Sequence, residues 1–237
     1  MNTLSVVIPS KNFVNLRASV AALHDANQES KLIIVDDGIS ESGYHRDSGE
    51  YNLGACLDGS TIVPGVKPFC FSSNVNIGIR EALSDENISS VVLLNDDALL
   101  KTPSGFTLLQ QCAEAHPEYG IISAATNNVG NVNQYLQRGG GLREDPRMVC
   151  FVCVLIPRRT IDLIGDLDTR FYTGGFEDDD YCVRIRQAGL KIGIFDGTFV
   201  DHYSLTSTFR GPGGPGYQME IGAKIFKEKW GTDNRGV

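Results

Sequence analysis

Two acidic clusters, each following an apolar or glycine-rich run, are the residues best suited to chemistry. Residues 95–97 (Asn-Asp-Asp) follow the apolar run 91–94, and residues 177–180 (Glu-Asp-Asp-Asp) follow a Gly-Gly-Phe sequence. Crowded carboxylates repel one another, so they persist where a cation binds or where one of them carries a proton. A divalent metal with a bound phosphate, plus a general base, would use both clusters. Either cluster alone is equally compatible with a solvated turn or a helix N-terminus, which also favours acids.

The composition is that of a globular protein with a hydrophobic core. Of its 237 residues, 41% are hydrophobic and 21% are charged. The net charge of -8 argues against broad nucleic-acid binding, which needs a basic face. No apolar run approaches the length of a membrane span, and no basic region of a signal peptide precedes the first strand-like run. We therefore expect a cytoplasmic protein whose six cysteines are reduced.

Apolar runs alternate with amphipathic stretches in the first half of the chain. We expect strands at 4–8, 31–35, 66–71 and 91–94, and helices at 14–26, 77–83 and 106–115. This alternation predicts an α/β fold, a mostly parallel central sheet with helices on both faces. Ligands of such sheets bind beyond the carboxyl ends of the strands. Pro9, Ser10, Asp37 and residues 95–97 all fall at such ends, so we expect them to converge.

The second half has a less regular pattern. We expect strands at 135–142, 148–156, 191–195 and 198–200, a short helix ending at 161–165, and helices at 178–188 and 217–230. Residues 206–217 are rich in Gly and Pro and predict no regular element. We expect one domain over 1–237 with a continuous sheet, in which 1–97 form a nucleotide-sugar-binding half and 98–237 an acceptor and catalytic-base half.

Six motifs in order resemble those of inverting family 2 glycosyltransferases, which have the GT-A fold. They are residues 6–12 (Val-Val-Ile-Pro-Ser-Lys-Asn), 34–38 (Ile-Val-Asp-Asp-Gly), 74–78 (Asn-Val-Asn-Ile-Gly), 93–97 (Leu-Leu-Asn-Asp-Asp), the acidic segment 165–184, and 201–202 (Asp-His). Each motif is weak alone, and their order along most of the chain makes the resemblance specific. One departure is Asn95, which stands where the family's D-x-D motif begins with Asp.

The resemblance implies transfer of a sugar from a nucleotide-sugar donor to a hydroxyl of a glycan, a lipid-linked or another acceptor, as in polysaccharide biosynthesis. It implies Mn²⁺ or Mg²⁺ bound by Asp97 and His202, with Asp178 as the general base whose pKa the neighbouring carboxylates raise. Asp37 is expected to bind the nucleotide base and Asp96 the ribose. The donor site is completed by Pro9, Ser10, Asn76 and, from the Gly-rich segment, Arg210.

Two other classes of function stay open at this point. A sugar-phosphate nucleotidyltransferase would carry a Gly-rich loop with Lys or Arg after the first strand, and residues 9–12 form no such loop. A catalytically dead glycan- or nucleotide-binding module would not need to keep Asp97 and Asp178. The donor sugar, the nucleotide and the acceptor cannot be read from the sequence, because loops determine specificity.

Overall fold

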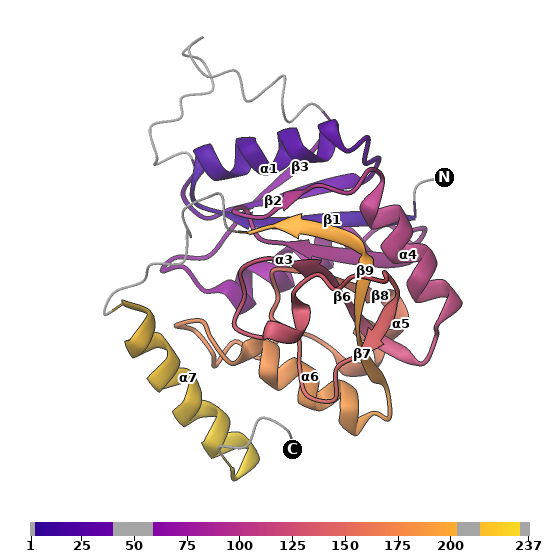
Figure 1. Ribbon diagram of the computed structural model, residues 1–237. Coiled ribbons are helices and arrows are strands. Elements are labelled where there is room, and N and C mark those ends of the chain that lie inside the picture. Colours follow the sequence, from indigo (N-terminus) through magenta and orange to yellow (C-terminus); the bar gives the residue numbers. More distant parts are fainter. Residues whose placement is uncertain (1–2, 40–58, 203–213, 233–237) are drawn as a thin grey trace.

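The computed structural model describes residues 3–39, 59–202 and 214–232, and these ranges form a single nine-stranded sheet covered by helices (Figure 1). The strands are β1 (Leu4–Ser10), β2 (Lys31–Asp36), β3 (Thr61–Pro64), β4 (Ser90–Leu94), β5 (Leu99–Leu100), β6 (Tyr119–Thr126), β7 (Leu142–Glu144), β8 (Cys153–Pro157) and β9 (Lys191–Asp201). The helices are α1 (Phe13–Asp25), α3 (Phe71–Leu83), α4 (Gly105–Ala115), α5 (Arg158–Ile164), α6 (Glu177–Gln187), α7 (Gly214–Trp230) and the 3-10 turn η2 (Val132–Gln134).

The strand order is β3-β2-β1-β4-β8-β6-β9-β5, with β7 beside β9. The first half is parallel, since β1 pairs with β2 and β4, and β2 pairs with β3. The second half is mixed, because β8 runs antiparallel to both β4 and β6, while β6 and β9 are parallel. The chain passes from β6 to β8 without an intervening α-helix, and a parallel pair would need such a crossover. The expected continuous sheet is confirmed, although it is mixed rather than mostly parallel.

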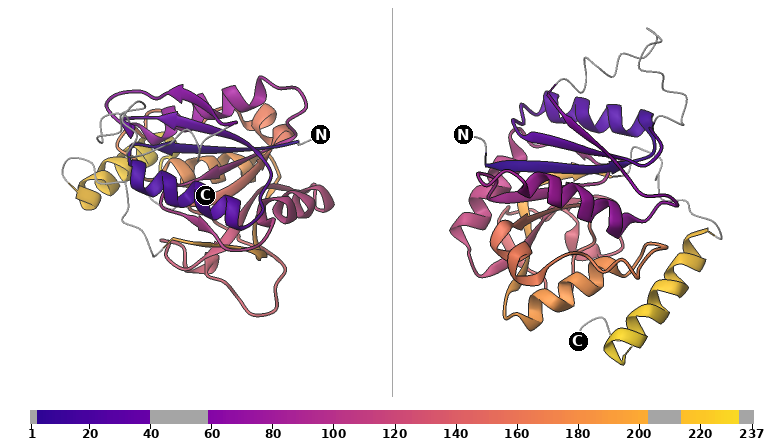
Figure 2. Two further views of the ribbon diagram at one scale, coloured as in Figure 1. Left: turned by 90° about the horizontal axis from the view of Figure 1, so that it is seen from above. Right: turned by 180° about the vertical axis from the view of Figure 1, so that it is seen from behind.

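Helices cover both faces of the sheet, as expected for this fold class (Figure 2). Phe13 and Leu16 of α1 and Phe106 of α4 share one core with alternate strand residues such as Val6 and Ile8. On the opposite face, α3, α5 and α6 pack against the remaining strand residues, such as Val7. Every residue of β4 is buried because the strand lies between the two cores. The carboxyl ends of β1, β2 and β4 therefore lie on a rigid edge.

Some predicted elements differ from the observed ones. The strand expected at 66–71 is wrong: β3 lies earlier, and α3 begins at Phe71. Pro68 has no N–H for a strand ladder, which explains why 66–70 cannot continue the sheet. The strand expected at 135–142 is also wrong, because the glycines at 139–141 interrupt it and only β7 follows. β6 was not predicted, since its Gly, Ser and Ala residues weaken the apolar signal.

The last helix lies at the edge of the molecule, beside the N-terminal end of α6 (Figure 1). Phe226 of α7 is buried in a small third core with Phe171, Phe176 and Val183. None of the helices in the described ranges combines the length and the apolar character needed to cross a membrane.

Candidate functional site

The ends of the three parallel strands bring Ser10, Asp37 and Asp96 together. Ser10, the last residue of β1, donates its hydroxyl to Oδ2 of Asp96 after β4, at 2.6 Å. The backbone N–H of Asp37, which follows β2, donates to the carbonyl of Ser10 at 2.9 Å. This convergence follows from the parallel pairing, which aligns the carboxyl ends of neighbouring strands. The preceding Asp36 has a structural role, because its Oδ1 accepts the N–H groups of residues 38 and 39 and closes the turn.

Asp37 is buried without a hydrogen-bond partner for its carboxylate. Neither oxygen has one among the described residues, and the side chain sits close to Lys11 and Lys67. Burial raises the pKa of this carboxyl to about 6, and the charges of the two lysines and the nearby amide of Asn74 only partly oppose the effect. A buried polar group without a partner is rare in folded proteins. The position suits a ligand that supplies an N–H or O–H donor.

Asp97 and His202 form the second contact at this edge of the sheet. Nε2 of His202 lies 3.1 Å from Oδ1 of Asp97, and Nδ1 lies 2.6 Å from the carbonyl oxygen of Asn128. A carbonyl only accepts, so Nδ1 carries a hydrogen and the second nitrogen faces the carboxylate. Burial disfavours the imidazolium, but the hydrogen bond and charge of Asp97 outweigh burial and raise the pKa of His202.

This pair fits a divalent cation. In the neutral imidazole, Nε2 and the carboxylate oxygen present lone pairs to each other, so a proton or a cation between them relieves the repulsion. An oxygen and an imidazole nitrogen are ligands that suit Mn²⁺. Within residues 3–39, 59–202 and 214–232, no three His, Cys, Asp or Glu side chains converge on one point. A cation held here would take its remaining ligands from water or from a bound diphosphate.

A cavity of about 280 Å³ joins the two acidic clusters. It is lined by Pro9, Phe69, Phe71, Asn95, Asp96, Asp97, Cys150, Phe151, Val152, Gly174, Gly175, Glu177, Asp178, His202, Gln218 and Met219. Asp97 and Asp178 are separated by 81 positions in the chain, and only the fold places them on one cavity. The cavity therefore holds both candidate metal ligands and the candidate base.

The second cluster forms the first turn of α6. Phe176 precedes the helix in a left-handed conformation, with φ at 72°, and makes no side-chain cap. Asp178 accepts the backbone N–H of Asp179 through Oδ1 at 2.9 Å. The raised pKa expected for Asp178 stays a prediction, whereas its neighbour Glu177 has a raised pKa. Burial, and then the charge of Asp178, raises the pKa of Glu177 to about 8.

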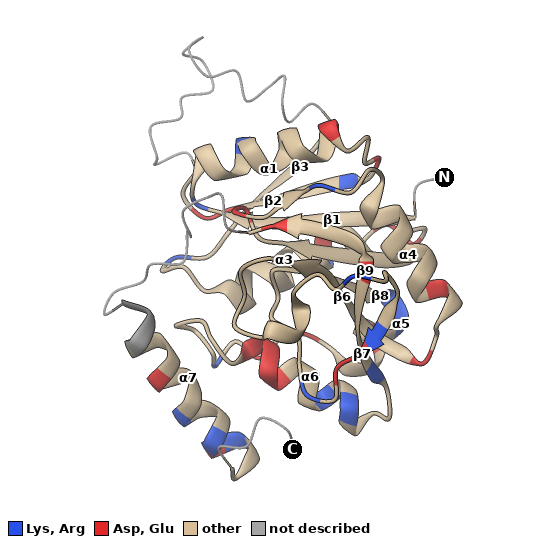
Figure 3. Ribbon diagram, in the orientation of Figure 1, with Lys and Arg blue, Asp and Glu red and all other residues tan. Residues whose placement is uncertain are grey.

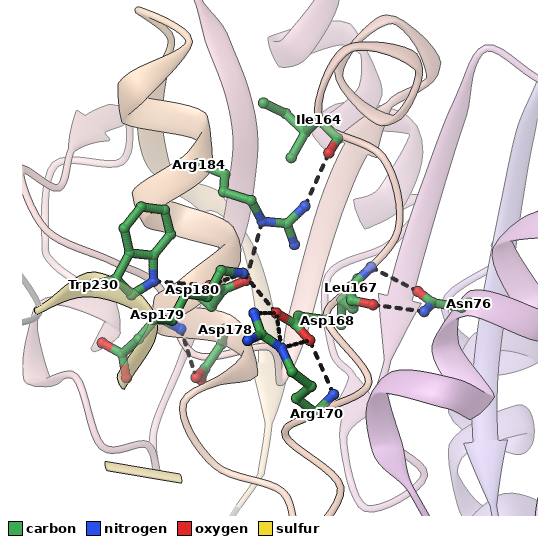
Figure 4. Close-up of polar contacts among 11 residues, drawn as sticks. Asn76, Ile164, Leu167, Asp168, Arg170, Asp178, Asp179, Asp180, Arg184 and Trp230 are labelled. Atoms are coloured by element: carbon green, nitrogen blue, oxygen red, sulfur yellow. Dashed lines mark hydrogen bonds and ion pairs between the residues drawn. The ribbon is translucent and has the colours of Figure 1, made fainter. Parts of the chain in front are cut away.

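Three predicted donor-site residues, Ser10, Asp37 and Asn76, are not among the residues that line the cavity in the described structure. Asn76 is buried in α3 and does not line the cavity; its amide donates to the carbonyl of Leu167 and accepts the N–H of Leu167, both at 2.9 Å (Figure 4). Asn76 therefore holds the segment between α5 and α6 in place, because both polar atoms of its side chain are bonded to Leu167. Arg210 lies outside the described residues, together with most of the Gly-rich segment.

Part of the cavity wall was not predicted from the sequence. Glu177 was considered as a neighbour of Asp178 and as an alternative base, and its Oε2 is buried without a partner in the described structure. Phe151 was expected inside a buried strand, and it instead lines the cavity just before β8. Gln218 and Met219 come from the last helix, which carries no motif. The glycines before the acidic cluster were a signal for Glu177. No signal in the sequence indicated that α7 lines the cavity.

Taken together, the mixed sheet, the helices on both faces and the cavity at the strand ends define a GT-A type α/β fold. A solved structure described as GalNAc-T7 with UDP, GalNAc and Mn²⁺ superimposes with a TM-score of 0.67 at 13% identity, covering 85% of this chain and 44% of that one. This likeness shows the fold.

Curated proteins that are similar in sequence include a galactosyltransferase and a bacterial protein. Human beta-1,4-galactosyltransferase 3 is 31% identical over 131 residues, which are 55% of this chain and 29% of that protein. A Sinorhizobium fredii protein named "Uncharacterized protein y4gI" is 23% identical over 219 residues, 79% of this chain and 23% of that protein. The chain thus spans less than a third of the length of these relatives. No protein-family model matches it.

Proposed function

We propose that this protein is a glycosyltransferase that moves a sugar from a nucleotide-sugar donor to an acceptor hydroxyl with inversion and with the help of a divalent cation. The observation that carries the proposal is the cavity on which Asp97, His202 and Asp178 converge. The similarity to a galactosyltransferase and to a fold solved with UDP and Mn²⁺ supports the donor class. Membership of family 2 and a role in polysaccharide biosynthesis rest on the sequence motifs and remain predictions.

The edge formed by β1, β2 and β4 would bind the nucleotide. Asp37, whose carboxylate is buried and unpartnered in the described structure, would accept a hydrogen bond from the base. Asp96, already fixed by Ser10, would accept one from the ribose. Asp97 and His202 would hold Mn²⁺ or Mg²⁺ beside the diphosphate. When bound, the cation would neutralise the negative charge that grows on the leaving group.

Asp178, which lines the same cavity, would act on the acceptor. The acceptor oxygen forms a bond to the anomeric carbon while the bond from that carbon to the phosphate oxygen breaks. The proton of the acceptor hydroxyl passes to the Asp178 carboxylate, and the electron pair leaves with the nucleoside diphosphate. One displacement without a covalent intermediate inverts the anomeric centre. The wall of the cavity also carries apolar side chains, including Phe151 and Met219.

The proposal is tested by incubating the protein with a panel of sugar nucleotides, Mn²⁺ and simple glycan acceptors. We expect release of nucleoside diphosphate with one donor, formation of a glycoside, and inversion in the proton NMR coupling of the anomeric hydrogen. Pyrophosphate formation from a sugar phosphate and a nucleoside triphosphate would instead identify a nucleotidyltransferase. Donor binding without transfer or hydrolysis under any of these conditions would leave a binding module.

A further inference from the structure

α7 packs closely against the turn that leads into the acidic cluster. A Cβ at Gly222 would lie 2.5 Å from the carbonyl oxygen of Gly175 and 2.9 Å from the ring of Phe176. Met219, one turn earlier, would in turn lie 3.0 Å from a Cβ at Gly175. Since no side chain fits between them, the backbone of α7 contacts the turn directly. Gly222 is the residue that makes this approach possible.

The turn itself is held in an unfavourable conformation. Gly174, Gly175 and Phe176 all have positive φ angles, of 81°, 86° and 72°. The left-handed region is open to glycine, but it is strained for a bulky residue such as Phe, and surrounding contacts must maintain it. The ring of Phe176 is buried, and its centroid lies 5.7 Å from the centroid of the Phe226 ring. α7 thus supplies the contacts that hold the turn, and Glu177 follows it immediately.

The C-terminal end of α7 is held against the first turn of α6, which carries the acidic cluster (Figure 4). Asp180 is fully buried. Its Oδ1 accepts a hydrogen bond from Nε1–H of Trp230 at 2.9 Å and lies 2.6 Å from Nζ of Lys229. Lys229 also donates to Asp168 at 2.7 Å, and Arg184 donates to Asp180 at 3.1 Å. Figure 3 shows basic residues in the last turns of α7 and acidic residues at the start of α6. The opposite charges fix the register between the two helices.

We infer that α7 positions the catalytic carboxylate, with Gly222 as the positioning residue that sets the distance between this helix and the turn 174–176. The inference rests on the proposed function for its link to activity. Phe226, Lys229 and Trp230 keep α7 in place, and the backbone contact at Gly222 passes that position to the turn. Asp178 lies in the first helical turn after it, so a shift of the turn moves the base relative to the donor. A misplacement of about 1 Å can lower a rate on the order of 10²-fold.

The test is Gly222→Ala. In a helix interior, alanine is intrinsically more favourable than glycine, so this change does not weaken α7 itself. The added methyl must push the turn away, because its nearest neighbour is backbone. We expect kcat to fall about tenfold or more while the affinity for UDP with Mn²⁺, measured by calorimetry, stays within about twofold. The matched control is Gly141→Ala, whose Cβ would meet nothing within 4 Å and whose kcat should be unchanged.

Hydrogen exchange gives a second readout that does not depend on activity. We expect faster exchange of the amides 174–180 in Gly222→Ala than in Gly141→Ala. Equal kcat in the two variants, equal exchange, or a loss of UDP affinity in proportion to kcat would each overturn the inference. Failure of the proposed function would appear differently, as absence of transfer by the unmodified protein, and the exchange comparison would then still decide whether α7 holds the turn.

A variant at the other end of α7 covers the case in which Gly222→Ala does not fold. Lys229→Met removes the charge that reaches Asp180 but keeps the length of the side chain. Trp230 is the only tryptophan in the chain, so its fluorescence reports whether α7 remains packed. With packing retained or partly lost, kcat should fall by more than the UDP affinity, and exchange at 174–180 should rise. Unchanged kcat and exchange in a folded Lys229→Met protein would overturn the inference.

Discussion

The two acidic clusters line one cavity but are held in place by different means. Asp96 and Asp97 follow a strand buried on both sides, and their partners are the Ser10 hydroxyl and the His202 imidazole. In the cluster at 177–180, Asp180 is surrounded by the cations Lys229 and Arg184 and by the indole of a distant helix. The first cluster is positioned by the pairing of strands. The second depends on a strained turn and on packing against α7.

The two halves of the site should therefore respond differently to mutation. Strand register involves many backbone hydrogen bonds, so loss of one side chain leaves the remaining groups of the first cluster in place. A buried ion pair that loses one partner leaves an uncompensated charge, which is strongly destabilising. Changes near α7 should therefore affect both stability and turnover, whereas changes at the strand ends should affect ligand binding.

The largest effect is expected for Asp178→Asn. The amide keeps the shape of the carboxylate but cannot take the proton of the acceptor, so kcat should fall on the order of 10²-fold or more. The affinity for UDP with Mn²⁺, measured by calorimetry, should stay near that of the unmodified protein. Asp162→Asn, at an exposed position of α5, serves as the control. Near-normal turnover of Asp178→Asn would move the role of base to Glu177 or Asp180.

Asp180→Ala should be the most destabilising change in the helix-borne cluster. It leaves Lys229, Arg184 and Trp230 without their shared acceptor, and removal of one partner of a buried ion pair costs about 3–5 kcal/mol. Urea unfolding followed by the fluorescence of Trp230 measures this loss directly. A loss below about 1 kcal/mol would show that α7 is held by its apolar contacts alone.

Removal of the metal tests the strand-borne cluster. We expect activity to disappear in excess EDTA and to return with Mn²⁺, because Asp97 and His202 form a pair of candidate cation ligands on the cavity. Asp97→Ala should weaken both Mn²⁺ and UDP binding about tenfold or more, with little change in unfolding free energy. Titration of each variant by calorimetry measures both affinities. Full activity in EDTA would assign charge neutralisation to Lys or Arg side chains.

The pH dependence of stability should reveal Glu177. Its pKa is raised to about 8 by burial and by the charges of Asp178 and Asp179, so the folded state keeps a proton that the unfolded chain has lost. Stability should therefore fall as pH rises from about 4.5 to about 8, and the loss is complete above the raised pKa. Glu177→Gln should reduce this dependence and be the more stable protein at pH 9, by about 1 kcal/mol or more. The assignment would be contradicted if the unfolding free energy, measured in urea, changed equally between pH 5 and pH 9 in the two proteins.

The smallest effect is expected for Ser10→Ala. It removes the 2.6 Å hydrogen bond to Asp96 while the strand pairing stays intact, so the loss of stability should be about 1 kcal/mol. UDP binding, measured by calorimetry, should weaken only severalfold. A loss as large as that of Asp180→Ala would mean that side chains, rather than strand register, position the first cluster.

Local pattern was sufficient to predict the strands at β1, β2 and β4 and the helix that follows β1. Their apolar runs are continuous and end in polar groups, and burial between two layers requires such runs. The same runs place Ser10, Asp37 and Asp96 at one edge, because parallel strands share a direction. Their proximity was therefore predictable from order and periodicity alone. The short strand β3, and β7 after the glycines at 139–141, were not predictable, because neither has an apolar pattern long enough to indicate a strand.

Tertiary packing alone decided how the second cluster is arranged. The acidic residues 177–180 were evident in the sequence, but the contacts of Asp180 with Lys229 and Trp230 depend on a helix about fifty positions later. The role of Asn76 in holding Leu167 likewise joins residues 91 positions apart. Periodicity records which face of an element is apolar, and it does not record which distant element covers that face. The charge state and position of a buried carboxylate depend on that cover, because solvation and nearby cations determine both.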